Sequence, residues 1–187
     1  MRIISGNLKG KKILQPKDTL TRPLKDLTKE SIFNIIQHSK SSDVKIKNSS
    51  ILDLFSGVGS FGLECLSRGA STVTFLENHK EALTILKKNI QNLELDNYSK
   101  IVEKNIFEEN TLISLNNRFE IIFLDPPYKE KQLMKLLNKI IHLRLLKENG
   151  IFIIHRHKKE EDIFPDNFKI ILKRSYGVSK IIFGKQV

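Results

Sequence analysis

The segment IIFLDPPYKE, residues 121–130, places a carboxylate, two prolines and a tyrosine directly after an apolar run. Four consecutive apolar residues predict a strand buried on both faces, as in the middle of a parallel sheet. Asp125 then stands at the carboxyl end of that strand, where open α/β sheets bind ligands. Pro126 and Pro127 have a fixed φ and no N–H, so they form a stiff elbow before Tyr128. A strand end with a capping aspartate explains the same residues, and the surrounding chain has to decide between the two interpretations.

A glycine-rich segment, LDLFSGVGSFGLE, provides a second candidate site at residues 52–64. Gly57, Gly59 and Gly62 match the spacing G-x-G-x-x-G, and Glu77 follows twenty residues after Gly57 at the end of another apolar run. Such glycines let the backbone approach a ligand at a helix N-terminus, and a carboxylate at the next strand end can accept both ribose hydroxyls. On spacing alone, this pattern fits a nicotinamide dinucleotide enzyme.

Asp53 favours a different cofactor. It lies four residues before Gly57, where its carboxylate would repel a pyrophosphate. S-adenosylmethionine carries an ammonium and a sulfonium group, for which a carboxylate is suited. The dehydrogenase interpretation also leaves Asp125 without a role and has no obvious proton-relay residue. We therefore expect an S-adenosylmethionine site.

The elements that must position these residues alternate between strand and helix from residue 51 onward. Apolar runs predict strands at 50–55, 72–77, 100–105, 120–125 and 150–155, and amphipathic patterns predict helices at 62–69, 79–93 and 130–146. Residues 168–176 and 179–185 resemble a closing antiparallel pair. This alternation predicts an α/β fold with a doubly wound, mostly parallel sheet, although the order of its strands is not readable from sequence.

Residues 1–50 form a separate basic extension. Gly6, Asn7 and Gly10 lie between two β-prone ends and predict a hairpin, a helix is expected after Pro23, and residues 40–50 read as a polar linker. We therefore divide the chain into an extension at 1–50 and a domain at 51–187.

The net charge of +11 is concentrated at the two ends of the chain. Residues 1–50 hold eleven Lys/Arg against four Asp/Glu, residues 51–150 hold thirteen of each, and residues 151–187 hold eight against four. A neutral centre with basic ends suggests a polyanion-binding surface, although a lysine-rich composition would also raise the charge.

No apolar run is long enough to span a bilayer, the N-terminus lacks an apolar signal region, and the single Cys65 allows no internal disulfide. We expect a cytoplasmic protein with no metal site and no membrane partner.

Several segments together resemble one family. DLFSGVGSFG is similar to motif I of class I S-adenosylmethionine-dependent methyltransferases, and DPPY to their amino-methylating motif IV. MRIISGNLKGKKI, TRPLKDLTKESIFN, LDLFSGVGSFGLECLSRGA and FLDPPY resemble the ribosomal RNA small-subunit methyltransferase D family along essentially the whole chain. The resemblance implies a Rossmann-like methyltransferase that modifies the exocyclic N2 of a guanine in small-subunit (16S) ribosomal RNA. The expected partner is that RNA within an assembling or assembled 30S particle, and a monomer is expected.

The resemblance also implies roles for individual residues. The cofactor's methionine and ribose side would be lined by Asp53, Phe55, Ser56, Gly57 and Gly59, its ribose hydroxyls held by Glu77, and its adenine flanked by Asn78, Asn105 and Ile106. The basic ends of the chain, and not the resemblance, predict the RNA contacts. Phosphate contacts are expected from Arg2, Lys9, Lys11, Lys12, Arg22 and Lys25, with a salt bridge to Asp26 as an equal alternative for Arg22, and contacts to the base or the adjoining backbone from Ser5 and Asn7. Where the family often has a glutamate after the fifth strand, this chain has His155, for which a basic rim on a nucleic-acid face is an adequate explanation.

The chemistry of an exocyclic amine accounts for the DPPY segment. Such an amine is a poor nucleophile, because its lone pair is delocalised into the base. Asp125 would accept one of its N–H groups and the Pro126 carbonyl the other, while Pro127 keeps the segment rigid and Tyr128 stacks on the flipped base. The open alternatives are an adenine-N6 DNA methyltransferase, which would use the same acceptors, and a non-catalytic ribosome-assembly binder, which would not need them.

Overall fold

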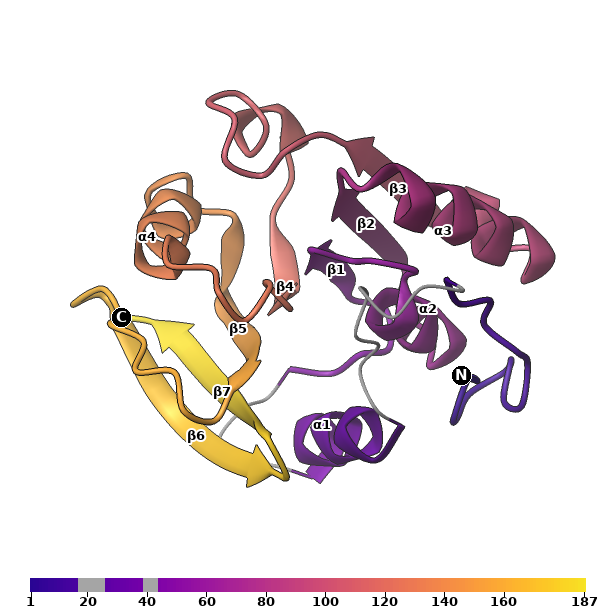
Figure 1. The fold of residues 1–187 in the computed structure, drawn as a ribbon, viewed down its shortest axis with the longest axis horizontal. Coiled ribbons are helices and arrows are strands. Elements are labelled where there is room, and N and C mark those ends of the chain that lie inside the picture. The colour runs from indigo at the N-terminus through magenta and orange to yellow at the C-terminus, as the bar shows by residue number, and fades with distance from the viewer. Residues whose placement is uncertain (17–25, 39–43) are drawn as a thin grey trace.

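A computed structural model describes residues 1–16, 26–38 and 44–187. Within these residues, one sheet of seven strands runs in the order β3-β2-β1-β4-β5-β7-β6 (Figure 1). Its strands are β1 (Ser50–Leu54), β2 (Thr72–Glu77), β3 (Ser99–Glu103), β4 (Phe119–Leu124), β5 (Leu146–His157), β6 (Phe168–Tyr176) and β7 (Ser179–Gln186). The helices are α1 (Asp26–His38), α2 (Ser60–Ser67), α3 (Lys80–Asn92) and α4 (Leu133–His142), and short 3-10 turns span Asp96–Tyr98 and Ile113–Leu115.

The doubly wound sheet with an antiparallel closing pair is confirmed. Strands β1 to β5 pair in parallel, and β7 joins β5 and β6 in antiparallel fashion. In Figure 1, α1, α2 and α3 lie on one side of the sheet and α4 on the other. Within the described part of the chain, the helices are all too short or too polar to cross a membrane.

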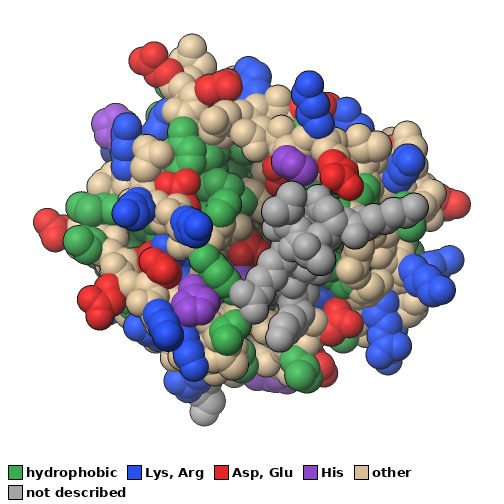
Figure 2. All heavy atoms as spheres, viewed as in Figure 1, with side chains coloured by type: hydrophobic (Ala, Val, Ile, Leu, Met, Phe, Trp, Pro, Cys, Tyr) green, Lys and Arg blue, Asp and Glu red, His purple; other side chains and the backbone are tan. Residues whose placement is uncertain are grey.

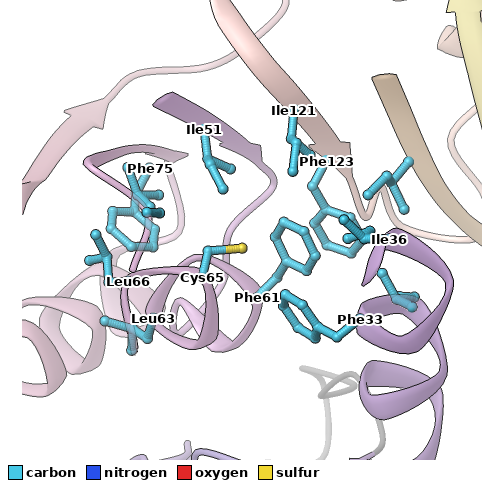
Figure 3. Packing of buried hydrophobic residues seen from close by; sticks show 14 of the residues in the cluster. Phe33, Ile36, Ile51, Phe61, Leu63, Cys65, Leu66, Phe75, Ile121 and Phe123 are labelled. Carbon is cyan, nitrogen blue, oxygen red and sulfur yellow. The ribbon is translucent and has the colours of Figure 1, made fainter. Parts of the chain in front are cut away.

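The core consists of two hydrophobic clusters, one on each face of the sheet. On the α1–α3 face, Phe61 stacks on Phe33 with ring centroids 5.2 Å apart and on Phe123 with centroids 4.0 Å apart. Figure 3 shows these rings bridging α1, α2 and β4, with Cys65 beside them. Cys65 is buried and unpaired, and burial raises the pKa of its thiol. Packing is therefore its role, as the apolar face of the predicted helix indicated.

The segment after α4 differs from prediction. The helix predicted to reach residue 146 ends at His142, and Arg144 takes a positive φ of 52°. The Leu145 carbonyl then accepts a hydrogen bond from the Phe119 amide, and Leu146 pairs with Phe119 in the sheet. Both leucines are buried, and a buried leucine is compatible with a helix or with a strand, so their hydrophobicity could not distinguish the two.

Residues 1–16, here called the arm, form the expected hairpin as a single antiparallel bridge between Arg2 and Lys12. The arm docks on the end of α2, where the Asn7 amide donates to the Ser67 carbonyl at 2.8 Å. Gly6 has a φ of +86°, and a Cβ there would lie 1.8 Å from the Ser67 oxygen, so this turn requires glycine. The arm contributes to the same hydrophobic cluster as the sheet. The division of the chain at residue 50 stays a prediction.

Candidate active site

The carboxyl ends of the central strands bring the predicted site residues together. In the register of the sheet, Leu54 lies opposite both Leu76 and Leu124, and Leu124 lies opposite Ile154. The next residue of each strand therefore reaches one edge of the sheet; these residues are Phe55, Glu77, Asp125 and His155. The connection after β1 crosses one face through α2 and the connection after β4 crosses the other through α4. This edge is thus the switch point at which open α/β sheets bind ligands.

Glu77 holds the glycine loop in place. Its Oε2 accepts a hydrogen bond from the Gly57 amide at 2.7 Å, and its Oε1 accepts from the Asn78 and His79 amides at 2.9 Å each. The Ser56 amide donates to the Leu76 carbonyl, which fixes the start of the loop against β2. A carboxylate has about four acceptor positions. Glu77 can therefore brace the loop and still accept a ligand hydroxyl.

Asp53 is almost completely buried, with 1% of its surface exposed. Its Oδ2 accepts a hydrogen bond from the Gly62 amide at 3.0 Å, whereas its Oδ1 has no hydrogen-bond partner among the described residues. Burial raises the pKa of this carboxyl well above its ordinary value, and the nearby charges of Asp125 and Glu77 raise it further. A buried acceptor without a partner is costly, so Asp53 is suited to a cationic or donating ligand group.

The predicted adenine side is formed by the loop after β3. The Asn105 side chain accepts a hydrogen bond from the Phe107 amide at 3.0 Å, and Ile106 lies in the core with 3% exposed. Gly59 and Asn78 lie in the loops after β1 and β2. Sequence reasoning missed Phe107, whose half-buried ring lies 6.2 Å from that of Phe55. The aromatic residue directly after Ile106 was the available signal.

Asp125 contacts His155, and this overturns the expectation that His155 lies on a basic rim. His155 is 6% exposed, and its Nδ1 lies 2.7 Å from Asp125 Oδ1. Its neighbour Arg156 is 2% exposed and donates to the Pro127 carbonyl at 3.1 Å and the Glu130 carbonyl at 3.0 Å. His155 and Arg156, the first two residues of the segment HRHKK, are therefore buried and hydrogen-bonded to the DPPY loop.

Tyr128 lies against β5 and β7. Its hydroxyl is 3.2 Å from Ser179 Oγ, and its ring is in edge contact with His157, with centroids 5.0 Å apart. Pro126 is buried and Pro127 exposed. No hydrogen bond within residues 1–16, 26–38 and 44–187 is accepted by the Pro126 carbonyl. Its oxygen is therefore a candidate acceptor for a ligand N–H.

The predicted RNA-contacting residues lie mainly in the arm. The exposed ones are Arg2, Asn7, Lys9, Lys11 and Lys12. Ser5 is half-buried, and its amide donates to Glu64 of α2 at 2.9 Å, so it anchors the arm. Arg22 and Lys25 lie outside the described residues. Figure 2 shows Lys and Arg side chains around much of the margin of one face, and hydrophobic and acidic side chains border a hollow near its middle.

Comparison with known proteins identifies the family. The family described as conserved hypothetical protein 95 matches residues 1–185. A ribosomal RNA small subunit methyltransferase D from Buchnera aphidicola is 36% identical over 176 residues, which cover 92% of this chain and 86% of the relative. The chain belongs to the family described as conserved hypothetical protein 95.

A second member, the ribosomal RNA small subunit methyltransferase D of Haemophilus influenzae, is 30% identical and covers 95% of this chain and 90% of its own. A solved Escherichia coli structure, described as a candidate methyltransferase, has a TM-score of 0.80 and 24% identity and covers 100% of this chain and 97% of its own. This likeness confirms the Rossmann-like methyltransferase fold. The family match includes the arm, so the arm is a family feature as well as the sheet.

Proposed function

We propose that the protein transfers a methyl group from S-adenosylmethionine to the exocyclic N2 of a guanine in small-subunit ribosomal RNA. Two relatives named as small-subunit methyltransferases cover more than nine tenths of the chain, which supports the substrate class. The observation that carries the chemistry is Asp125, because it opens a D-P-P-Y segment at the same sheet edge as the glycine loop.

The residues at this edge fit S-adenosylmethionine. When bound, this cofactor supplies an electrophilic methyl group on a cationic sulfur. Asp53 Oδ1, which has no partner among the described residues, suits the cofactor's ammonium group, and Glu77 has one acceptor position left for a ribose hydroxyl. A Cβ on Gly57 would meet nothing within 4 Å, so the loop surface is open there. Phe55 and Phe107 offer apolar surface for the adenine.

Asp125 and the Pro126 carbonyl act on the substrate amine. Each accepts one N–H, which favours a pyramidal, electron-rich nitrogen. Rigid acceptors stabilise the transition state without reorganising, and the prolines provide that rigidity. After transfer the nitrogen is cationic and loses a proton, for which the Asp125 carboxylate is the adjacent acceptor. Tyr128 provides an aromatic surface for a base extruded from its stack.

The arm provides the RNA-binding surface in this proposal. Its exposed Arg2, Lys9, Lys11 and Lys12 would contact phosphates, which position an RNA without reading its sequence. Selection of one guanine then has to come from the shape of the RNA. We therefore propose a partly or fully assembled 30S particle as the preferred substrate and a monomer as the acting species.

Paired substitutions test the assignment of roles. Asp125→Ala should abolish methyl transfer with cofactor affinity changed by no more than a few-fold. Glu77→Ala should chiefly weaken cofactor binding, because it removes both the ribose acceptor and the brace on the Gly57 amide. Calorimetry with S-adenosylmethionine and single-turnover methyl transfer measure the two effects. A near-normal single-turnover rate in Asp125→Ala would show that Asp125 does not act on the amine.

A further inference from the structure

We infer that His155 is a positioning residue of the methyl transfer, which orients the Asp125 carboxylate toward the substrate amine. This inference rests on the proposed function. It concerns a residue at which the chain departs from the family resemblance. The contact that carries it is the 2.7 Å hydrogen bond between His155 Nδ1 and Asp125 Oδ1.

Asp125 needs such a partner. Its side chain is 22% exposed, and within the described chain its carboxylate has no other hydrogen bond than the one with His155. The terminal torsion of an aspartate is broad, so an unheld carboxylate would sample many orientations. With Oδ1 fixed by His155, Oδ2 is the oxygen left for the amine.

The carboxylate of Asp125 fixes the direction of this bond. A carboxylate can only accept, so Nδ1 carries the hydrogen. Nε2 is then the acceptor nitrogen, and it is buried with no partner among the described residues. Moving the hydrogen to Nε2 would set the Nδ1 lone pair against the carboxylate and leave a buried Nε2–H donor without an acceptor, which costs about 1–3 kcal/mol. The site therefore selects the imidazole tautomer that donates to Asp125.

Arg156 performs a separate task on the other face of the sheet. It donates to the carbonyls of Pro127 and Glu130 and pairs with Asp162 at 2.8 Å, so it fixes the backbone of the loop. A fixed backbone leaves the Asp125 side chain free to rotate. His155 removes that remaining freedom, since successive residues of β5 point to opposite faces.

Three substitutions at His155 test the inference. His155→Leu removes the donor and should lower kcat by about 10- to 100-fold, because misplacement of a catalytic group by about 1 Å costs roughly that much. The KM for S-adenosylmethionine and for RNA should change by less than about twofold, and kcat is calculated per cofactor-binding site counted by calorimetry, so that a loss of folded protein does not lower it. His155→Asn places an amide N–H near the Nδ1 position and should restore kcat to within about threefold of the wild type. His155→Gln carries its amide one methylene farther and should restore less.

The matched control is His142, which is exposed at the end of α4. Its Leu, Asn and Gln variants should all retain the wild-type kcat. If His155→Leu does not fold, the order of the Asn and Gln variants decides the question alone. Equal kcat values for Asn and Gln, or an unaltered kcat in a folded Leu variant, would overturn the inference.

Nitrogen NMR of labelled histidine provides a test that needs no activity. His155 should carry its hydrogen on Nδ1 in the wild type and lose this preference in Asp125→Ala. A hydrogen on Nε2 in the wild type would overturn the inference and leave the proposed function standing. A wild-type protein that transfers no methyl group, with the Nδ1 tautomer present, would instead overturn the proposed function.

Discussion

Removal of Glu64 should weaken the attachment of the arm to α2 and lower the stability of the fold. Glu64 lies on α2 and is fully buried, yet four groups converge on it. Its oxygens accept hydrogen bonds from the Ile4 amide at 2.8 Å, the Ser5 amide at 2.9 Å and Arg68 Nε at 2.8 Å. The Nζ of Lys29, which is also fully buried, lies 3.6 Å away. Glu64→Ala leaves the two arm amides without their acceptor and removes the buried counter-charge of Lys29, whose ammonium keeps its hydrogen bond to the Arg2 carbonyl at 2.9 Å.

The size of the effect follows from these contacts. Breaking a buried ion pair by removing one partner costs about 3–5 kcal/mol, and we expect a loss in that range for Glu64→Ala. For a chain of this size, that loss lowers Tm by about 6–20 °C. Chemical denaturation gives the free energy of unfolding. The control Glu81→Ala, at the exposed start of α3, should cost less than about 1 kcal/mol.

The pH dependence tests the same reasoning. Burial lowers the pKa of Lys29 below 10.5, and Glu64 opposes that shift, so the pKa falls further in Glu64→Ala. Between the folded and unfolded pKa values the unfolded chain binds more protons, so stability rises with pH in that window. The deficit of Glu64→Ala should therefore shrink as the pH approaches 10.5 from below. A loss of under about 1 kcal/mol, or a deficit that does not change with pH, would refute the role of this ion pair.

Three further changes have defined outcomes. Burial raises the pKa of Asp53 in the folded state, so the free energy of unfolding falls as the pH rises from 3.8 through the folded-state pKa. Asp53→Asn should remove that decline in denaturation curves. The same variant should weaken S-adenosylmethionine binding in calorimetry. Asn89 is buried and joins the arm to the glycine loop through three hydrogen bonds, so Asn89→Ala should destabilise the fold by about 1–3 kcal/mol and lower cofactor affinity as well. Neutralising Lys9, Lys11 and Lys12 should flatten the plot of log RNA affinity against log salt by roughly 0.7–0.9 per lost phosphate contact and leave cofactor binding unchanged. An unaltered salt slope would remove the arm from the RNA-binding surface.

Local patterns were sufficient to predict the elements and most of the site edge. Gly69 follows α2 with a φ of +92°, as a helix-ending glycine should. Asp125 follows a strand that is buried on both faces, because the apolar run before it has the length and composition of such a strand. The glycine loop lies between β1 and α2, as its sequence predicted. Each of these features depends on neighbours within a few residues, which is why local patterns could predict them.

Features that depend on distant partners could not be predicted. His155 and Arg156 belong to a polar segment whose composition predicts an exposed position. Both are buried in contact with the DPPY loop, some thirty residues earlier in the chain, and no local pattern indicates such a contact. Leu145 and Leu146 continue an amphipathic helical pattern, yet pairing with β4 places them in an extended segment. The order of the strands likewise depends on tertiary packing, which periodicity does not encode.

Mapping of the methylated nucleoside tests the central claim most directly. Small-subunit particles and naked small-subunit RNA, both lacking this modification, are incubated with the protein and labelled S-adenosylmethionine at matched salt, then digested for nucleoside mass spectrometry. The account predicts N2-methylguanosine at a single position, more of it in the particle than in naked RNA, and none with Asp125→Ala. Label on adenine N6, label on DNA, or equal labelling by Asp125→Ala would contradict it.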